Sequence, residues 1–463
     1  MIILTIVVVY VITLFLISIY ANRLVRGNTA EYLLANRNLP FWIVSVMITG
    51  LAIGGASTIG VAENAYNVGL AAGWYSVAWA AGAALMGFFG APAWRRMAVS
   101  TIPEMLGNYY GPGSRIMGVI LQIVITMVIT CLQFVAGGTL LSSMLPEYFT
   151  LNTGMILTAL VFIGITAIGG LWAGGLSNVI NVTVIWIGSI VGMIMSWERA
   201  GGTYEITSKL PEGVNYLSPI GGLSLGVLFG WFMVMITQSF SVQATEQIAF
   251  AARDPREARR GFLMGACLMA PVGFFAAVIG IASRSMFPDI SAIKALPMMI
   301  MSLPAWVSGL VLSGLWAADI STGCALLLGV TTLFEKDIFE WSMRTRNRDV
   351  SQRAKMWVSR ALVLALGGVC LLMALRVSGI LETLLIGLSL CTPFTIIFLF
   401  TSYAPSFCKK PAASFTILAG TILLFAWILL PDIRVLPHPI YLEWMVCLPV
   451  FLAVSYLSRD KIK

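Results

Sequence analysis

Long apolar runs, separated by short polar segments, follow one another along the whole chain. A helix needs about 20 mostly apolar residues to cross the hydrocarbon core of a bilayer. Thirteen runs approach or exceed that length, and they lie near residues 2–22, 41–66, 72–93, 115–144, 154–172, 178–197, 219–250, 261–285, 303–332, 356–375, 380–402, 413–431 and 440–458. The pattern predicts an all-α polytopic membrane protein with about 13 transmembrane helices.

The composition supports this reading. Of the 463 residues, 59% are hydrophobic and 10% are charged, and the mean hydropathy is +0.92. A soluble domain of this size would lack the polar side chains needed to cover its surface. The net charge of +8 is explained by the placement of charges in loops, so we expect a lipid bilayer and no nucleic acid as partner.

Basic residues fall mainly in alternate loops, which predicts the orientation. With the N-terminus outside, 22 of the 28 Lys and Arg residues lie on the cytoplasmic side and six on the outer side. Cytoplasmic loops carry such an excess of positive charge. We therefore expect a plasma or inner membrane protein with its N-terminus outside and its C-terminus in the cytoplasm. The stretch 335–355 is the densest in charge, and we expect it to be a solvated cytoplasmic loop.

Few residues in the chain suit catalysis or metal binding. The seven cysteines are scattered without a CxxC pair, and His438 is the one histidine. These features predict neither a disulfide framework nor a metal cluster, and we expect no enzyme and no cofactor. The apolar run at 2–20 lacks a basic leading region and a cleavage site, so we expect it to be a retained helix.

The stretch Leu310 to Val330 carries the most informative polar residues. Near the middle of this apolar run stand Asp319, Ser321 and Thr322. A carboxylate at bilayer depth is costly and normally faces protein or a water-filled cavity. At about 100° per residue, the two hydroxyls share a helix face with Ala318, and hard oxygen ligands of this kind suit an alkali cation. Alternatively, the hydroxyls bond back to carbonyls of their own helix.

The run 41–66 is predicted to break in mid-membrane at the pair Gly54 and Gly55, because each glycine weakens a helix by about 1 kcal/mol relative to alanine. Unwound backbone at membrane depth is tolerated where it lines a cavity, and transporters use such breaks to bind sodium and substrate. The alternative is close helix packing through small residues.

Two further runs carry polar side chains that must face protein or a cavity. Gln122, Thr126, Thr130 and Gln133 form one stripe in the run 115–144. The second half of the run 219–250 is polar too, and there the side chains either face a cavity or bridge neighbouring helices. Its polar or aromatic residues are Trp231, Thr237, Gln238, Ser239, Ser241, Gln243, Thr245 and Gln247.

The other acidic residues in the spans have simpler explanations. Glu63 and Glu246 lie near helix ends, where they would reach the membrane interface. Glu382 and Glu443 stand one turn inside their spans, where a bent side chain would reach water. Asp319 is then the acid that needs a cavity.

Several stretches together resemble the sodium:solute symporter family, whose members include sodium/glucose, sodium/proline, sodium/pantothenate and sodium/sialic-acid symporters. They cover residues 31–340 in the family's order and read ANRNLPFW, IGVAENAYNVGLAAGW, APAWRRMAVSTIPEMLGNYYG, IGGLWAGGLSNVINV, Gln243 to AFAARDPREARRG, and AADIST…LFEKDIF. No single stretch is specific, but the combination is.

The resemblance implies a LeuT-like core of two five-helix inverted repeats. It divides the chain into an N-terminal helix and loop (1–40), the first repeat (41–197), an external loop (198–218), the second repeat (219–402) and two C-terminal helices (403–463). It also implies a sodium site. Carried over by position, the ligands are the backbone carbonyls of Gly50, Ile53 and Ala318 and the hydroxyls of Ser321 and Thr322.

The sequence departs from the family pattern around that site. Cys324 and Ala325 stand where relatives with a second sodium site have an aspartate and further serines, so one sodium is expected. Ala52 replaces an aspartate of the sodium/proline type, and Asp319 stands where an aliphatic residue is usual. Ser177, Asn178 and Asn181 replace the common Thr–Asp…Gln pattern. We expect Asp319 to supply negative charge near the sodium or a proton-linked step, or else to face a neighbouring helix.

The resemblance also places a substrate pocket between the two broken helices and the third core helix. By position its candidate residues are Ser57, Thr58, Gln122, Gln238 and Ser239. These spans contain no Arg or Lys, which argues against an arginine clamp on a carboxylate of the sialic-acid kind.

We therefore expect a sodium-coupled symporter that imports a small organic solute, such as an amino acid, carboxylate, sugar or vitamin-like molecule. Its partners would be the solute, sodium and lipid, with a monomer as the functional unit. A proton-coupled symporter using Asp319 is the main alternative, and a nontransporting sensor on the same fold is another. A channel would need a repeated filter motif, and the sequence has none.

Overall fold

The computed structural model describes residues 2–25, 27–376, 387–430, 432, 434–458 and 460. These residues form helices joined by turns, with an isolated parallel bridge between Leu39 and Ala252. The helices up to the middle of the chain are α1 (Ile2–Val25), α2 (Thr29–Leu34), α3 (Phe41–Ala52), α4 (Val61–Val68), α5 (Trp74–Leu85), α6 (Ala91–Met97), α7 (Ile102–Tyr110), α8 (Pro112–Met144), α9 (Leu151–Arg199) and α10 (Gly202–Lys209).

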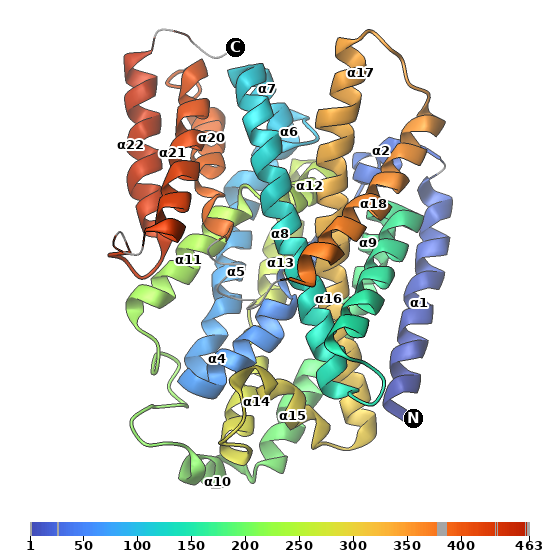
Figure 1. Cartoon of the computed structure of the whole chain (residues 1–463), viewed down its shortest axis with the longest axis vertical. Coiled ribbons are helices and arrows are strands. Elements are labelled where there is room, and N and C mark those ends of the chain that lie inside the picture. Colours follow the sequence, from blue (N-terminus) through green and yellow to red (C-terminus); the bar gives the residue numbers. More distant parts are fainter. Residues whose placement is uncertain are drawn as a thin grey trace.

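The second half continues in the same way. Its helices are α11 (Leu225–Ser239), α12 (Gln243–Ala251), α13 (Pro255–Met269), α14 (Val272–Met286), α15 (Ala295–Met301), α16 (Ala305–Leu333), α17 (Trp341–Thr345), α18 (Gln352–Ala374), α20 (Thr392–Tyr403), α21 (Lys410–Leu429) and α22 (Pro439–Leu457). Most run along the long axis of the molecule (Figure 1).

Nine helical segments of the described residues are long and apolar enough to cross a membrane, and the bent pair α11–α12 makes a tenth. The other predicted runs are found in shorter or merged helices. α3 and the helix ending at Tyr403 are short apolar helices, and part of the run 380–402 lies outside the described residues. The protein is a multi-pass membrane protein.

α9 holds two predicted runs because it turns back on itself. At Gly170 the backbone leaves helical geometry, with φ 53° and ψ −137°. Gly170 packs against Tyr32 of α2, at the upper end of Figure 1, whereas the following α10 lies at the lower end. The positive φ explains why glycine is found at this turn.

α16 forms the centre of the bundle. In the most apolar 18-residue stretch of the span Ala305–Thr345, which begins with α16, 89% of the residues are buried, compared with 22% in the corresponding stretch of α1. α16 packs against α8, α9 and α1, so its side chains meet protein on nearly every face. Polar groups on this helix must therefore find partners inside the protein.

The sequence predicted that the stretch 335–355 is a solvated loop, and this is wrong for its first part. α16 continues into the π-helical segment η6 (Phe334–Glu340), and Asp337 is buried there. Arg115 donates to the Asp337 carboxylate at 2.7 Å. This ion pair lets the charged segment pack against the bundle. The predicted outer loop 198–218 likewise contains a short helix, α10.

Candidate functional site

The first broken helix ends where the sequence predicted. α3 stops at Ala52, and Ile53 takes φ −94° and ψ 83° outside helical geometry. Helical structure resumes at the π-helical segment η2 (Ala56–Gly60), before α4. The break frees backbone carbonyls, and nearby hydroxyls bond to two of them: Ser57 donates to the Ala52 oxygen at 2.6 Å and Thr58 to the Gly54 oxygen at 3.1 Å.

The hydroxyls of α16 reach across to the last turn of α3. Ser321 donates to the Gly50 carbonyl at 2.7 Å, and Thr322 to the same oxygen at 2.9 Å. Both also lie within hydrogen-bond distance of the Ala318 carbonyl, at 2.8 and 3.1 Å. The two alternatives drawn from the sequence thus occur together, since each hydroxyl meets its own helix and α3.

The result is a group of convergent oxygens from two helices. Thr322 also lies 3.2 Å from the Leu51 carbonyl. The N–H of Ile53 donates to Thr49, and the structure gives the Ile53 carbonyl no bond to either hydroxyl. Carbonyl and hydroxyl oxygens without a charged group form the kind of hard ligand set that suits a small monovalent cation.

A polar chain runs from this oxygen group to the N-terminal helix. Asn178 of α9 lies against Gly50, where an added Cβ would be 2.8 Å from its Nδ2. Asn181 donates to the Asn178 side-chain oxygen at 3.1 Å, and Tyr10 donates to Asn181 at 2.6 Å. Residues that depart from the family pattern therefore stand beside the predicted sodium ligands.

Asp319 points away from those hydroxyls, toward α8. Its Oδ2 lies 2.5 Å from where a Cβ on Gly137 would stand, and its Oδ1 lies 3.6 Å from that point on Gly55. The residue is 2% exposed, and neither carboxylate oxygen has a hydrogen-bond partner among the described residues. The carboxylate thus faces a neighbouring helix and the α3 break.

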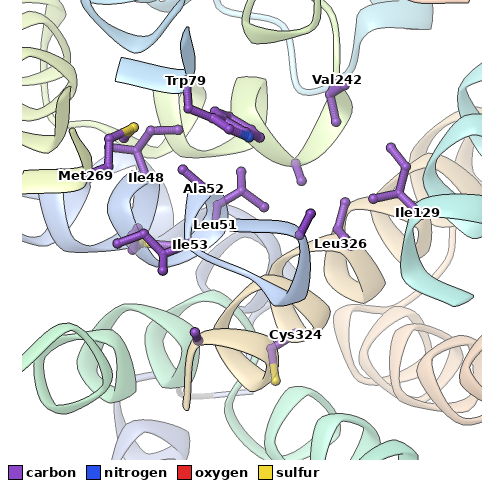
Figure 2. Close-up of a cluster of buried hydrophobic side chains, with 14 of the residues drawn as sticks. Ile48, Leu51, Ala52, Ile53, Trp79, Ile129, Val242, Met269, Cys324 and Leu326 are labelled. Carbon is purple, nitrogen blue, oxygen red and sulfur yellow. The ribbon is translucent and has the colours of Figure 1, made fainter. Parts of the chain in front are cut away.

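A small cavity of about 40 Å³ lies beside the oxygen group, which is enough space for a few water molecules. Figure 2 shows Trp79 over Leu51 and Ala52, with Val242, Ile129 and Leu326 nearby. Its walls come from α3, α5, α8, the α11–α12 pair, α16 and Leu388. The described lining residues are Leu51, Ala52, Gly54, Ala56, Ser57, Tyr75, Trp79, Ile129, Gln133, Gln238, Val242, Thr245, Thr322, Leu326 and Leu388.

Two of the five predicted substrate residues, Ser57 and Gln238, line this cavity. The other three make contacts elsewhere. Thr58 bonds back to Gly54 at 3.1 Å, Ser239 donates to Met235 at 2.7 Å, and Gln122 donates to the Ser241 carbonyl at 2.8 Å.

Besides Thr322, which was predicted as a sodium ligand, four polar or aromatic lining residues were not among the predicted substrate residues: Gln133, Tyr75, Trp79 and Thr245. A signal existed for Gln133, which belongs to the polar stripe of α8. Thr245 belongs to the polar second half of the run 219–250. The two aromatic residues sit in an apolar helix, and nothing in the sequence separates them from lipid-facing aromatics.

Two acidic residues are more deeply buried than the sequence predicted. Glu246 was expected to reach the interface and Glu443 to reach water, but each is 0% exposed. Glu246 stands within the bundle because α12 packs against α16 and α6. Glu443 faces Gly420 of α21 and accepts a hydrogen bond from Cys447. Glu382 lies outside the described residues.

Comparison with solved structures supports the LeuT-like fold. A Na⁺-coupled sialic acid symporter in a substrate-bound outward-open state superposes with a TM-score of 0.84 at 16% identity, covering 100% of this chain and 98% of that one. A nucleobase-cation-symport-1 family transporter, Mhp1, gives a TM-score of 0.62 at 16% identity, with 92% of each chain covered.

Sequence comparison finds relatives among transporters. The sodium/pantothenate symporter of Escherichia coli (strain K12) is 26% identical over 79% of this chain and 78% of its own length. The sodium/glucose cotransporter of Vibrio parahaemolyticus is 24% identical over 72% of this chain. That match spans 67% of the Vibrio protein. A separate match to sodium/glucose cotransporter 4 from Danio rerio spans 61% of that protein.

The family comparison agrees with the fold and with the resemblance seen in the sequence. The sequence profile of the sodium:solute symporter family matches residues 32–420, most of the chain. The family and the relatives are transporters rather than enzymes. This chain belongs to the sodium:solute symporter family.

Proposed function

We propose that the protein is a sodium-coupled symporter that imports a small organic solute by alternating access. The contact between the Ser321 and Thr322 hydroxyls of α16 and the Gly50 carbonyl at the end of α3 carries the proposal. Sodium would bind among these oxygens and the Ala318 carbonyl, with Ile53 able to contribute its carbonyl when the break rearranges.

Thr322 provides the physical link between ion and solute. Its hydroxyl belongs to the oxygen group and its side chain also lines the cavity. A cation that fixes Thr322 therefore shapes the wall that the solute meets. Such coupling is reciprocal, so the solute must raise sodium affinity by the factor by which sodium raises solute affinity.

The cavity walls favour an uncharged or zwitterionic solute. Among the described lining residues none is Asp, Glu, Lys or Arg. Gln133 and Gln238 offer amide donors and acceptors, while Tyr75 and Trp79 offer aromatic faces. The candidates Ser57 and Gln238 remain in our proposed site, and sugars, neutral amino acids and vitamin-like molecules fit these walls better than multiply charged ones.

We place the two inverted repeats at 41–197 and 219–402, each opening with a broken helix, with the N-terminus outside and the C-terminus cytoplasmic in a plasma or inner membrane. Two observations support this. The α3 break and the 49° bend between α11 and α12 occupy the first helix of each repeat. α1 begins at one end of the molecule and α22 finishes at the other (Figure 1).

Sodium binding to the purified protein tests the proposal. Thermal unfolding in NaCl is compared with KCl for the wild type, the double variant Ser321→Ala with Thr322→Ala, and the control Thr331→Ala. Thr331 is a buried α16 hydroxyl that bonds to Leu327 within its own helix. At a sodium concentration 100 times Kd the expected stabilisation is about 2.7 kcal/mol.

We expect sodium to stabilise the wild type and Thr331→Ala, and the double variant to lose that response. Equal stability in NaCl and KCl for the wild type would contradict the sodium site. If pH instead of sodium shifted stability, the proton-coupled alternative would gain support.

A further inference from the structure

Glu246 of α12 is a buried carboxylate that the sodium and solute sites do not use. The residue is 0% exposed. Neither carboxylate oxygen has a hydrogen-bond partner among the described residues. Its neighbour Thr245 lines the central cavity, so Glu246 stands one residue from the solute site on the second broken helix.

Gln243 and Gln247, on either side of Glu246, bind α12 to segments on the side that we assign to the cytoplasm. Gln247 donates to the Leu33 carbonyl at 2.6 Å and to Thr332 at 2.9 Å. Gln243 donates to the Ser100 carbonyl at 3.1 Å and accepts from the Ile102 N–H at 3.1 Å. These bonds close the protein around Glu246 from that side.

Arg95 binds the backbone at the C-terminal end of α12. Its guanidinium donates to the Ala252 and Arg253 carbonyls at 2.7 and 3.1 Å. The cation is thus engaged with backbone beyond the last turn of α12. Any movement that opens this side must break the bonds of Gln243, Gln247 and Arg95, and would bring water to Glu246.

No charged group near α12 neutralises Glu246. Among the described residues no salt bridge involves Glu246, and α3 carries no titratable side chain. The titratable or charged side chains on the other elements that contact α12 are Glu31 and Tyr32 (α2), Arg37 (the 3-10 turn Ala35–Arg37), Arg95 and Arg96 (α6), Glu104, Tyr109 and Tyr110 (α7), Arg115 and Cys131 (α8), and Asp319 and Cys324 (α16).

An ionised carboxylate with no donor and no counter-charge is strongly disfavoured inside a protein. Glu246 must therefore hold either a proton or a cation in the closed arrangement. The surroundings favour a proton, because a cation would need several converging oxygen ligands, and no hydroxyl of the described residues lies within hydrogen-bond distance of this carboxylate.

We propose that Glu246 is a proton-binding site of the transport cycle. The carboxylate binds one proton when α12 closes against the cytoplasmic segments. It releases that proton to water when the bonds of Gln243 and Gln247 break. This inference rests on the proposed function as a transporter and adds a proton to its coupled ions, at a group separate from Asp319.

The test uses the full-length purified protein in weakly buffered KCl, with a pH-sensitive dye in solution. Sodium at the α3–α16 site would hold the closed arrangement, because α12 packs on α16. We expect added NaCl, compared with added KCl, to cause uptake of up to one proton per wild-type molecule at some pH between about 5 and 9. Glu246→Gln, which mimics the neutral acid, should reduce that uptake at least fivefold.

Glu443→Gln is the matched control, since Glu443 is an equally buried glutamate on α22; it should take up protons like the wild type. Equal proton uptake by Glu246→Gln and the wild type would overturn the inference. So would an absence of uptake in a wild type that sodium stabilises. Proton release that depends on Glu246 would instead identify a cation site.

A second measurement keeps the two proposals distinguishable if sodium gives no thermal stabilisation. Dicyclohexylcarbodiimide is an apolar reagent that modifies protonated carboxyl groups, and mass spectrometry locates the modified residue. We expect Glu246 to be modified, with a rate that falls as pH rises and changes at least threefold in the double variant Gln243→Ala with Gln247→Ala. A Glu246 that stays unmodified at every pH, or whose rate ignores the two glutamines, would sink the inference.

Discussion

Two helices are broken inside the bundle, and their freed carbonyls have different partners. At the α3 break, the oxygen of Gly50 receives two hydroxyls from α16, Ser321 and Thr322, at 2.7 and 2.9 Å. At the α11–α12 bend, the Ser241 carbonyl receives the Gln122 amide at 2.8 Å, and the Thr237 carbonyl receives the Thr395 hydroxyl at 2.6 Å.

The difference lies in what the donors can do besides donate. A hydroxyl also has oxygen lone pairs, so it can turn and coordinate a cation, whereas an amide N–H can only donate. The α3 break is therefore suited to exchange its hydrogen bonds for an ion. At the α11–α12 bend, the Gln122 N–H group cannot make this exchange, and of the two donors only the Thr395 hydroxyl could. We interpret that bend as a joint held by α8 and α20.

A side chain placed in the α3 break should have the largest effect on stability and on the sodium response. A Cβ on Gly54 would lie 2.8 Å from both Gln133 Oε1 and the Thr322 hydroxyl. Gly54→Val should cost about 1–3 kcal/mol through overpacking and should also abolish the sodium-dependent thermal shift by displacing Thr322. A normal sodium response in this variant would show that the break tolerates a side chain.

Removing the Gln122 amide at the α11–α12 bend should destabilise the folded protein without changing its sodium binding. Gln122→Met leaves the buried Ser241 carbonyl without this donor, at a cost of about 1–3 kcal/mol. Thermal unfolding in KCl measures the loss, and the further stabilisation by NaCl should match that of the wild type. A lost sodium response would mean that both breaks serve the ion site.

A smaller loss is expected from Thr395→Val, which keeps the side-chain shape and deletes its hydroxyl. The hydroxyl lies 2.6 Å from the Thr237 carbonyl and 2.8 Å from Ser241. Ser241 also donates to Thr237 at 3.1 Å, so one donor remains and the cost should be about 0.5–1.5 kcal/mol. Denaturation in both salts checks that the loss is the same with and without sodium.

The smallest effect concerns the loop that follows α12. Asp254 caps α13 by accepting the backbone N–H groups of Glu257 and Arg256, and these bonds lower the pKa of its carboxyl group. Its ionised form is stabilising above the usual aspartate pKa, and the stabilisation disappears as pH falls through the lowered value. Asp254→Asn keeps the cap but loses the charge, which should cost about 0.3–1 kcal/mol at neutral pH.

Unfolding measured from neutral to acidic pH tests this. The wild type and Asp254→Asn should converge in acid, and a difference that persisted there would show that geometry rather than charge is responsible.

The sequence predicted the α3 break and the polar face of α16 because both depend on local chemistry. Glycines weaken a helix wherever it packs, and hydroxyls at neighbouring positions share a face in any α-helix. The placement of Gln122 could not be predicted in the same way. Its position on the inward stripe of α8 was visible, but the choice between the cavity and the Ser241 carbonyl depends on how α8 meets α11.

The surroundings of Glu246 could not be predicted from the sequence either. Its distance from the end of the apolar run suggested access to the interface, and the burial of α12 against α16 and α6 removed that access.

The sequence by itself determined the class of protein, its all-helical architecture and the family, and it singled out the two helices to which we assign the sodium site. Apolar length, glycine and hydroxyl spacing act along one helix and need no knowledge of its neighbours. Only the tertiary structure decided that Asp319 faces Gly137, that Thr322 belongs both to the α3–α16 oxygen group and to the cavity lining, and that Glu246 is buried with no hydrogen-bond partner among the described residues. The direction and burial of a side chain depend on residues far apart in the chain, because the helix packed against each face decides which groups the side chain contacts.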